Sequence, residues 1–402
     1  MKDIWWPVIV PALLFAIAIG TTTPILIIAG LQAGGSQPTA AAIVALMGVA
    51  SLICTVPAGN FIDRVGDARA MVVASLAAIV VTGITVVALM LHSLPLYALG
   101  LFLRAPIQDL WNLARQAFVA TVLPPEDLGR GMTALGGTMR VGNLLGPMVS
   151  AGLLYIWPVW SVFVFSALCA LAAIIVLQLP AARAFEDVAG IGREKPSSAD
   201  KKSDTHPPLS QLDIRWNAVI LSGISVITLG LARSAMPAVV QLWGVELGLH
   251  KSTISLIIAL GAAVELCLMI PGAFIKDRMG RATTLCSCLS IFGLGLITMV
   301  LIPTASGLWL SMFIMALGNG LGTGINMTIG ADLSPTEGRA KFLGVWALFN
   351  TVGLLGGPSL ISALVALATL HIGVLSCGGL AVFGAAWMFL WRNQIKLPKK
   401  VR

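Results

Sequence analysis

Twelve long apolar runs constrain this chain more than any other feature of its sequence. Each run holds about 20 or more residues with few charges, which is the length that crosses the hydrocarbon core of a bilayer as a helix. Lipid offers no hydrogen-bond partner to an open backbone, and the runs lack the alternation typical of a membrane barrel, so the spans are predicted to be helices. The expected fold is an all-α integral membrane protein with twelve transmembrane helices. The runs cover about 5–30, 39–61, 70–91, 95–122, 128–155, 158–179, 215–242, 250–275, 282–303, 305–332, 335–366 and 369–391.

The composition excludes the soluble classes of protein. Charged residues make up 10% of the 402 residues and hydrophobic residues 57%, whereas a soluble domain carries roughly 25% charged residues. This excludes a soluble enzyme, and it also excludes a disordered scaffold, which needs low hydrophobicity and high charge. All six cysteines fall in apolar runs without metal-ligand spacing. We therefore expect buried free thiols, no metal site and no cofactor.

The positive charge follows the predicted topology. If both termini are cytoplasmic, 20 of the 25 Lys and Arg residues lie on the cytoplasmic side, four arginines lie within spans, and only Lys251 lies in an outer loop. This bias is typical of multi-pass proteins of the plasma (inner) membrane, whose cytoplasmic loops are enriched in Lys and Arg. Topology therefore accounts for the net charge of +8, and nucleic acid is not expected to be a partner.

The chain is predicted to consist of two six-helix halves. A charged stretch rich in Pro and Ser forms a predicted cytoplasmic linker at 181–213, between an N-terminal bundle at 1–180 and a C-terminal bundle at 214–402. The ten residues from Pro57 match those from Pro271 at an offset of 214 positions, and Pro24 matches Pro237 at an offset of 213. Parallel repeats of six spans are typical of transporters, whose substrate path lies between the halves near the bilayer midplane.

At these residues the chain resembles the major facilitator superfamily of secondary transporters over nearly its whole length. The resemblance implies two pseudo-symmetric six-helix bundles and a cytoplasmic gate formed by the loop after span 2, and by its repeat after span 8, against neighbouring helix ends. Ser334-Pro335-Thr336-Glu337, a capping box at the predicted start of span 11, offers such a helix end. The alternative is that the loop only determines topology. The residues matching the family's loop are Gly59, Asp63, Arg64, Gly66 and Arg69, and in the second copy Asp277, Arg278, Gly280 and Arg281.

Span 5 carries Gly142-x-x-x-Gly146-Pro147, which resembles the family's antiporter motif. Small residues let helix backbones approach closely, and proline bends a helix by removing a hydrogen bond. These residues are therefore a candidate hinge, although Gly-x-x-x-Gly is also common packing chemistry. The related Gly356, Gly357 and Pro358 in span 11 could have a structural role only.

Ionisable groups inside the spans are the candidates for the transport pathway, because such groups face a cavity or a partner. At 100° per residue, one arc of span 4 holds Arg104, Gln108, Trp111 and Arg115, extended by Asp109 and Asn112. Asp109 lies at a depth similar to that of Arg140 in span 5. We hypothesise that Asp109 pairs with Arg140 or Arg104, and that protonation of Asp109 frees the arginine during transport. The alternative is a permanent structural ion pair.

The second half offers four further candidates. Glu265 in span 8 has no basic neighbour within its helix, so apolar surroundings favour its neutral form, which suits either proton carriage or a hydrogen-bonded packing role. Arg233 in span 7 could attract anionic substrates or reach the lipid headgroups. Asn319 and Asn326 in span 10 are seven residues apart and share a helix face, where they could bind substrate or join helices.

These features predict a secondary active transporter, not an enzyme, that moves a small molecule by alternating access. The leading prediction is proton-coupled efflux, by antiport, of an amphipathic compound or metabolite. The alternative is proton-coupled uptake of an anionic metabolite, since Arg104, Arg140 and Arg233 could bind carboxylate or phosphate. A more distant alternative is a non-transporting membrane receptor. The expected partners are the substrate, protons as the coupling ion and the lipid bilayer, with the chain acting as a monomer.

Overall fold

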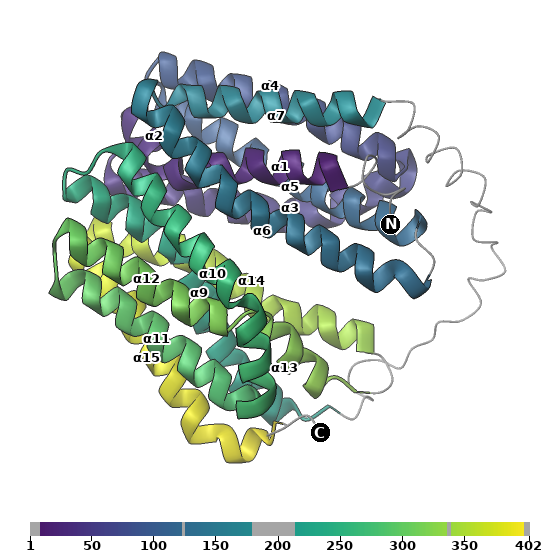
Figure 1. Cartoon of the computed structure of the whole chain (residues 1–402), viewed down its shortest axis with the longest axis vertical. Coiled ribbons are helices and arrows are strands. Elements are labelled where there is room, and N and C mark those ends of the chain that lie inside the picture. Colours follow the sequence, from purple (N-terminus) through teal and green to yellow (C-terminus); the bar gives the residue numbers. More distant parts are fainter. Residues whose placement is uncertain (1–8, 123–124, 179–213, 336–338, 398–402) are drawn as a thin grey trace. The chain divides into compact units, whose positions relative to one another are not determined.

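The computed structural model describes residues 9–122, 125–178, 214–335 and 339–397, and within these ranges it is built from helices and short connections without strands (Figure 1). The description does not extend to the side chains of residues 55–56, 120–130, 273, 275–277 and 339–341. The predicted linker at 181–213 and the capping-box residues Thr336 and Glu337 therefore lie outside the described residues, as does the side chain of Asp277.

The helices follow the predicted runs closely. Those of the first half are α1 (Val10–Thr22), η3 (Thr23–Ile25), α2 (Leu26–Gln32), α3 (Gln37–Val65), α4 (Asp67–Met90), α5 (Leu94–Val122), α6 (Pro125–Ile156) and α7 (Trp160–Gln178). Those of the second half are α9 (Trp216–Glu246), α10 (Lys251–Met279), α11 (Arg281–Leu301), α12 (Ala305–Leu321), α13 (Ile325–Leu333), α14 (Arg339–Leu367) and α15 (Leu370–Ile395).

These elements make twelve spans in the described part of the chain, because α1, η3 and α2 together form one span and α12 with α13 forms another. Length and composition qualify 10 helical segments as membrane-spanning. The other two spans, α5 and α6, are 29 and 32 residues long, and both carry ionisable residues. At 1.5 Å per residue, even 29 residues reach about 43 Å, which exceeds a hydrocarbon core of about 30 Å. The predicted twelve-helix fold is confirmed.

The chain divides into two compact units. The first contains α1 to α7 together with residues 250–259, and the second contains α9, the remainder of α10, and α11 to α15. In the first unit α1 packs against α6 and α7, while α4 packs against α5 and α7. In the second unit α9 packs against α14 and α15, while α11 packs against α12 and α15. The same pairing pattern in both units is what the sequence repeat predicts.

Glycine forms the junction at the equivalent place in each unit. Gly66 joins α3 to α4 with φ 93°, and Gly280 joins α10 to α11 with φ 83°. A side chain would strain this conformation, which glycine adopts at low cost because it has no Cβ. The two matching loop motifs therefore produce the same sharp turn between antiparallel helices.

Glycine also allows close contact between the helices at the centre of each unit. A Cβ at Gly146 of α6 would lie 2.5 Å from the Cα of Gly20 in α1, and a Cβ at Gly142 would overlap Ala16. In the second unit a Cβ at Gly357 of α14 would lie 2.6 Å from the backbone nitrogen of Ala235 in α9. A Cβ at Gly356 has ordinary room beside Leu231. Pro147 and Pro358 lie inside α6 and α14, both of which continue through them.

Candidate transport site

The two gate motifs have different surroundings in the structure. In the first unit Asp63, Arg64 and Arg69 are exposed, and Gly59 lies within α3 with open space around it. In the second unit Arg278 is exposed, but Arg281 is buried.

Arg281 forms an ion pair through its Nε, 3.2 Å from Oδ2 of Asp332. Asp332, near the end of α13, was not among the residues singled out from the sequence. Its place just before the predicted start of span 11 is the signal that could have found it.

The first spanning helix is interrupted beside a half-buried arginine. Between α1 and α2 the chain passes through η3, which contains Pro24. Arg104 of α5 reaches this break and donates a hydrogen bond from Nη2 to the hydroxyl oxygen of Thr22. Tyr97, also on α5 and fully buried, donates to the carbonyl oxygen of Leu26 at 2.5 Å. Two polar groups of α5 therefore stabilise the interrupted backbone of span 1.

Asp109 does not form the ion pair that the sequence suggested. Its carboxylate accepts a hydrogen bond from the hydroxyl of Ser51 on α3, and among the described residues it pairs with neither Arg104 nor Arg140. The physical reason lies in the helix geometry, because five residues separate Arg104 from Asp109 and rotate the side-chain direction by about 140°. Arg104 therefore faces α1 while Asp109 faces α3.

Two further polar side chains of this unit have hydrogen-bonding groups without a partner in the described part of the chain. Arg140 on α6 is half-buried and forms no hydrogen bond or ion pair within the described part of the chain. The Oδ1 atom of Asn112 is buried without a hydrogen-bond partner there. The structure thus brings Asp109 to Ser51 and Arg104 to Thr22, and it leaves Arg140 available.

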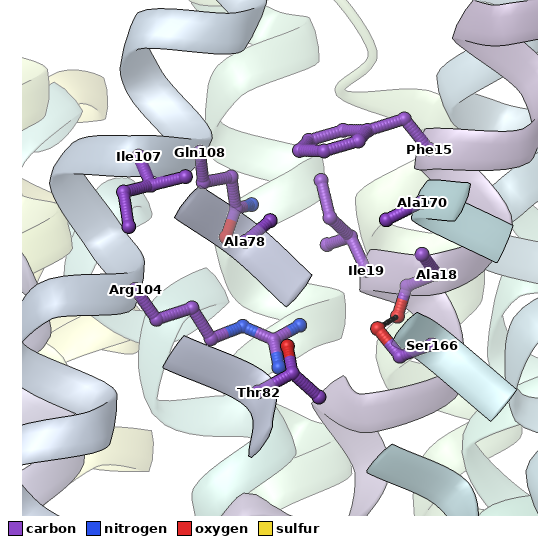
Figure 2. Close-up of a pocket in the computed structure, with 10 residues that line it drawn as sticks. All are labelled: Phe15, Ala18, Ile19, Ala78, Thr82, Arg104, Ile107, Gln108, Ser166 and Ala170. Carbon is purple, nitrogen blue, oxygen red and sulfur yellow. Dashed lines mark hydrogen bonds between the residues drawn. The ribbon is translucent and has the colours of Figure 1, made fainter. Parts of the chain in front are cut away.

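A small cavity inside the first unit explains where Arg104 and Gln108 point. It has a volume of about 30 Å³, which is enough for about one water molecule and not for a substrate. Figure 2 shows Arg104 extending toward Thr82, with Ser166 bonded to the carbonyl oxygen of Ala18 at 3.1 Å. The residues that line this cavity are Phe15, Ala18, Ile19, Ala78, Thr82, Arg104, Ile107, Gln108, Ser166 and Ala170.

The other half of the polar arc on α5, formed by Trp111 and Arg115, packs against neighbouring side chains inside the first unit. Trp111 is fully buried, stacks on Phe15 with ring centroids 4.0 Å apart, and donates to the hydroxyl of Ser75 at 3.1 Å. Arg115 lies over the same indole, 5.2 Å from its centroid. The arc predicted from the sequence therefore contains a polar section near the break in span 1 and an aromatic stack further along the helix.

In the second unit the structure brings together three residues from three helices. Asn319 of α12 donates from Nδ2 to Oε1 of Glu265 on α10 at 2.5 Å. Close approach makes this contact possible, since a Cβ at Gly320 would lie 2.7 Å from Cβ of Leu268. Arg233 of α9 donates from Nη2 to the carbonyl oxygen of Gly322 at 3.0 Å. We call Arg233, Glu265 and Asn319, with the carbonyl of Gly322, the α12 break cluster.

The break between α12 and α13 corrects two expectations. Span 10 is not a continuous helix, because α12 ends at Leu321 and α13 begins only after Gly324, which has φ 72°. Asn319 and Asn326 therefore do not share one helix face. Instead the Asn326 carbonyl accepts from Nε1 of Trp346 at 3.0 Å, and the Asn326 Oδ1 is buried without a partner in the described part. The glycines at 318, 320, 322 and 324 were the available signal for this interruption.

Two repeated bundles, each with an interrupted spanning helix beside an intramembrane arginine, are typical of a multi-pass membrane transporter. The model of the Major Facilitator Superfamily matches residues 10–229 and again residues 218–401. The chain therefore belongs to the Major Facilitator Superfamily, and the resemblance seen in its loop motifs is confirmed.

Individual relatives show the fold without showing the substrate. The chain is 34% identical over 115 residues to "Uncharacterized MFS-type transporter YdeG" of Bacillus subtilis (strain 168), a stretch that is 28% of this chain and 26% of that protein. A POT family transporter in complex with 5-aminolevulinic acid superposes with a TM-score of 0.76 at 13% identity, covering 96% of this chain and 95% of that one. A peptide transporter POT in complex with sulfate gives 0.74 at 16% identity, covering 99% and 96%.

Proposed function

We propose that this protein is a proton-coupled secondary transporter of the plasma membrane that exports an amphipathic compound or metabolite by antiport. Both termini are cytoplasmic. Glu265 and Asp109 carry the coupling protons, while the glycine contacts of α6 and α14 form the pivots about which helices move.

The observation that carries the proposal is the environment of Asp109. Its carboxyl lies within the spanning helix α5 and is bonded to a neutral hydroxyl, with no cation paired to it among the described residues. An ionised carboxylate in such surroundings is costly. The carboxyl is therefore stable there as the neutral acid, and it can release its proton when a conformational change brings water or a cation to it.

Glu265 supports the same conclusion from the second unit. It is bonded to the neutral amide of Asn319, within a cluster that also contains Arg233. The cluster lies where α12 is interrupted, and discontinuous helices are where transporters place their ion and substrate groups. Movement of α13 against α12 would change the contact between Arg233 and Gly322, and with it the charge near Glu265.

The test is transport by the purified protein in proteoliposomes with an imposed pH gradient and a pH-sensitive dye inside. Ethidium serves as the first amphipathic probe, followed by a panel of similar cations. Wild-type protein is expected to dissipate the gradient when a transported compound is added. Asp109→Asn keeps an acceptor for the Ser51 hydroxyl but removes the proton site, so compound-driven proton flux should fall to background.

Glu246→Gln is the matched control. Glu246 is the last residue of α9, and its half-exposed side chain belongs neither to the α12 break cluster nor to the surroundings of Asp109. This variant should dissipate the gradient as the wild type does. Unchanged proton flux in Asp109→Asn would remove Asp109 from the mechanism, and equal loss in both variants would assign the effect to folding.

One observation favours the alternative function, proton-coupled uptake of an anionic metabolite. Arg140 is half-buried and has no partner in the described part of the chain, so it can receive a carboxylate or phosphate. Benzoate is the corresponding probe. If benzoate accumulates with the proton gradient and Arg140→Gln abolishes this while ethidium has no effect, uptake replaces export.

A further inference from the structure

The second unit carries a groove between α11 and α15 that the transport mechanism does not use. These two helices pack side by side, and Figure 1 shows them next to each other in the second unit. Two adjoining hollows form the groove, with volumes of about 300 and 410 Å³. They share the lining residues Ala282, Thr283 and Arg392, so one continuous depression runs from the helix ends into the spanning region.

The groove opens at one end of both helices, at the depth of the lipid headgroups. Arg281 is the first residue of α11, and Arg392 lies in the last turn of α15. Because the two helices are antiparallel, these residues lie at the same end, which the charge distribution predicts to be cytoplasmic. The first hollow, which also includes Gly280, Asn393 and Leu397, is therefore at the membrane–water interface.

Arg392 provides the positive charge of the groove. Its guanidinium lies 4.2 Å from the ring centroid of Phe389, a contact that orients the charge, and it forms no ion pair within the described part of the chain. The other arginine in the lining, Arg281, is already paired with Asp332 at 3.2 Å. The groove therefore presents one guanidinium that is free to receive an anion.

Hydroxyl groups continue the polar lining into the membrane. Thr283, Ser287 and Ser290 line the hollows from α11, and the spacing of four and then three residues places them on one helix face. None of the three hydroxyls has a hydrogen-bond partner within the described part of the chain. Ser290 lies nine residues after Arg281, which is about 13 Å along the helix axis.

The rest of the same surface is apolar and exposed. Phe389 is 55% exposed and Leu390 72%, while Leu294 on α11 is 55% exposed. In a spanning helix, such side chains face lipid tails. A hydroxyl that faces hydrocarbon is stabilised when a hydrogen-bond acceptor reaches it. The groove combines such hydroxyls with a cation at the level of the lipid headgroups and an apolar wall at the level of the acyl chains.

We infer that the groove between α11 and α15 binds one anionic phospholipid of the bilayer. The phosphate lies against the guanidinium of Arg392, the glycerol esters accept from the hydroxyls of Thr283, Ser287 and Ser290, and an acyl chain lies along Phe389 and Ile291. Charge complementarity selects an anionic lipid over a zwitterionic one, since Arg392 faces no acidic side chain in the described part.

The experiment measures lipid retention by native mass spectrometry of the full chain, delipidated in detergent and titrated with dioleoylphosphatidylglycerol, dioleoylphosphatidylcholine or glycerol 3-phosphate. One phosphatidylglycerol should bind in preference to phosphatidylcholine, and glycerol 3-phosphate should not displace it. Arg392→Gln loses a charge-assisted hydrogen bond and should weaken phosphatidylglycerol binding about tenfold. The double variant Ser287→Ala with Ser290→Ala should weaken both lipids by a similar, smaller factor.

Lys396→Asn is the matched control. Lys396 is exposed at the same helix end and has φ 50°, which Asn tolerates, but it does not line either hollow. This variant removes one positive charge and should bind phosphatidylglycerol as the wild type does. Equal binding of phosphatidylcholine, full displacement by glycerol 3-phosphate, or equal loss in Lys396→Asn and Arg392→Gln would each overturn the assignment.

Discussion

Each unit interrupts one spanning helix beside a half-buried arginine, but the two interruptions are built differently. In the first unit Pro24 marks the break, and Arg104 reaches a side-chain hydroxyl of Thr22. In the second unit Gly324 marks the break, and Arg233 reaches the backbone carbonyl of Gly322. The interrupted helices, the first span of one unit and the fourth of the other, are not counterparts in the repeat. The fold is thus repeated, whereas the polar groups inside it are particular to each unit.

The two repeated prolines show the same difference. Pro24 lies in the short 3₁₀ segment η3, whereas Pro237 lies inside the uninterrupted 31-residue helix α9. Directly before Pro24, the hydroxyls of Thr21, Thr22 and Thr23 each donate to a backbone carbonyl of the preceding turn. The proline with an interrupted helix is therefore the one that follows a run of backbone-bonded threonines, which is consistent with polar side chains supporting irregular backbone in a membrane.

The glycine contacts are the feature that both units should share, and they give the largest expected effect. Gly146→Ala in the first unit and Gly357→Ala in the second place a methyl group against helix backbone, which cannot move aside as a side chain can. Each variant should lower the free energy of unfolding by about 3 kcal/mol. Detergent-based unfolding of the purified protein measures this change.

Controls for this prediction lie on the same two helices. Gly152 on α6 and Gly344 on α14 have nothing within 4 Å of a Cβ, so alanine at either position should be neutral or slightly stabilising because of its helix propensity. If one contact tolerates alanine and the other does not, the units differ in their packing as well as in their polar groups.

Much of the fold was predictable from the sequence, because a bilayer leaves few choices. The apolar runs located all twelve spans, and the repeat of the ten residues from Pro57 at Pro271 predicted the matching turns at Gly66 and Gly280. Both results depend on local patterns, namely span length and the conformational freedom of glycine.

The candidate site was less predictable, because it depends on which helix each polar side chain faces. Asp109 was predicted to extend a polar arc on span 4, but Ser51, its partner in the structure, is one hydroxyl in an otherwise apolar run with no pattern to mark it. The expected pair of Asp109 with an arginine was wrong, as was the shared face of Asn319 and Asn326. In both cases the sequence misplaced a side chain around or along its helix, so the predicted contact or shared face was wrong.

Replacing the two arginines tests whether the breaks are built differently. Arg233→Gln removes the charged donor that the carbonyl oxygens of Asn319 and Gly322 share, although the Gly322 carbonyl keeps its hydrogen bond from the N–H of Ile325. The loss of these two charge-assisted hydrogen bonds should cost about 2 kcal/mol of unfolding free energy. Arg104→Gln removes the donor to the hydroxyl oxygen of Thr22, but this hydroxyl still donates to the carbonyl of Ile19 at 2.9 Å. We expect this second variant to cost about 1 kcal/mol or less. Apparent Tm values of the two purified variants should fall in that order, and the reverse order would show that the first break is the more dependent on its arginine.

The smallest effects are expected at the ion pairs of the second unit. Arg281 and Asp332 have side chains only 9% and 20% exposed and lie 3.2 Å apart, whereas His371 and Glu246 are 47% and 42% exposed at 3.8 Å. Water screens the second pair, so Glu246→Gln should change the unfolding free energy by less than about 0.5 kcal/mol, while Asp332→Asn should cost about 1 kcal/mol. Adding 0.5 M salt, a concentration of about three times physiological ionic strength, should leave the larger effect mostly intact, because the buried pair is screened less.

Since the first unit has Asp67 where the second has Arg281, an effect of Asp332→Asn confined to the unfolding of the second unit would show that this pair stabilises one half of the repeat alone.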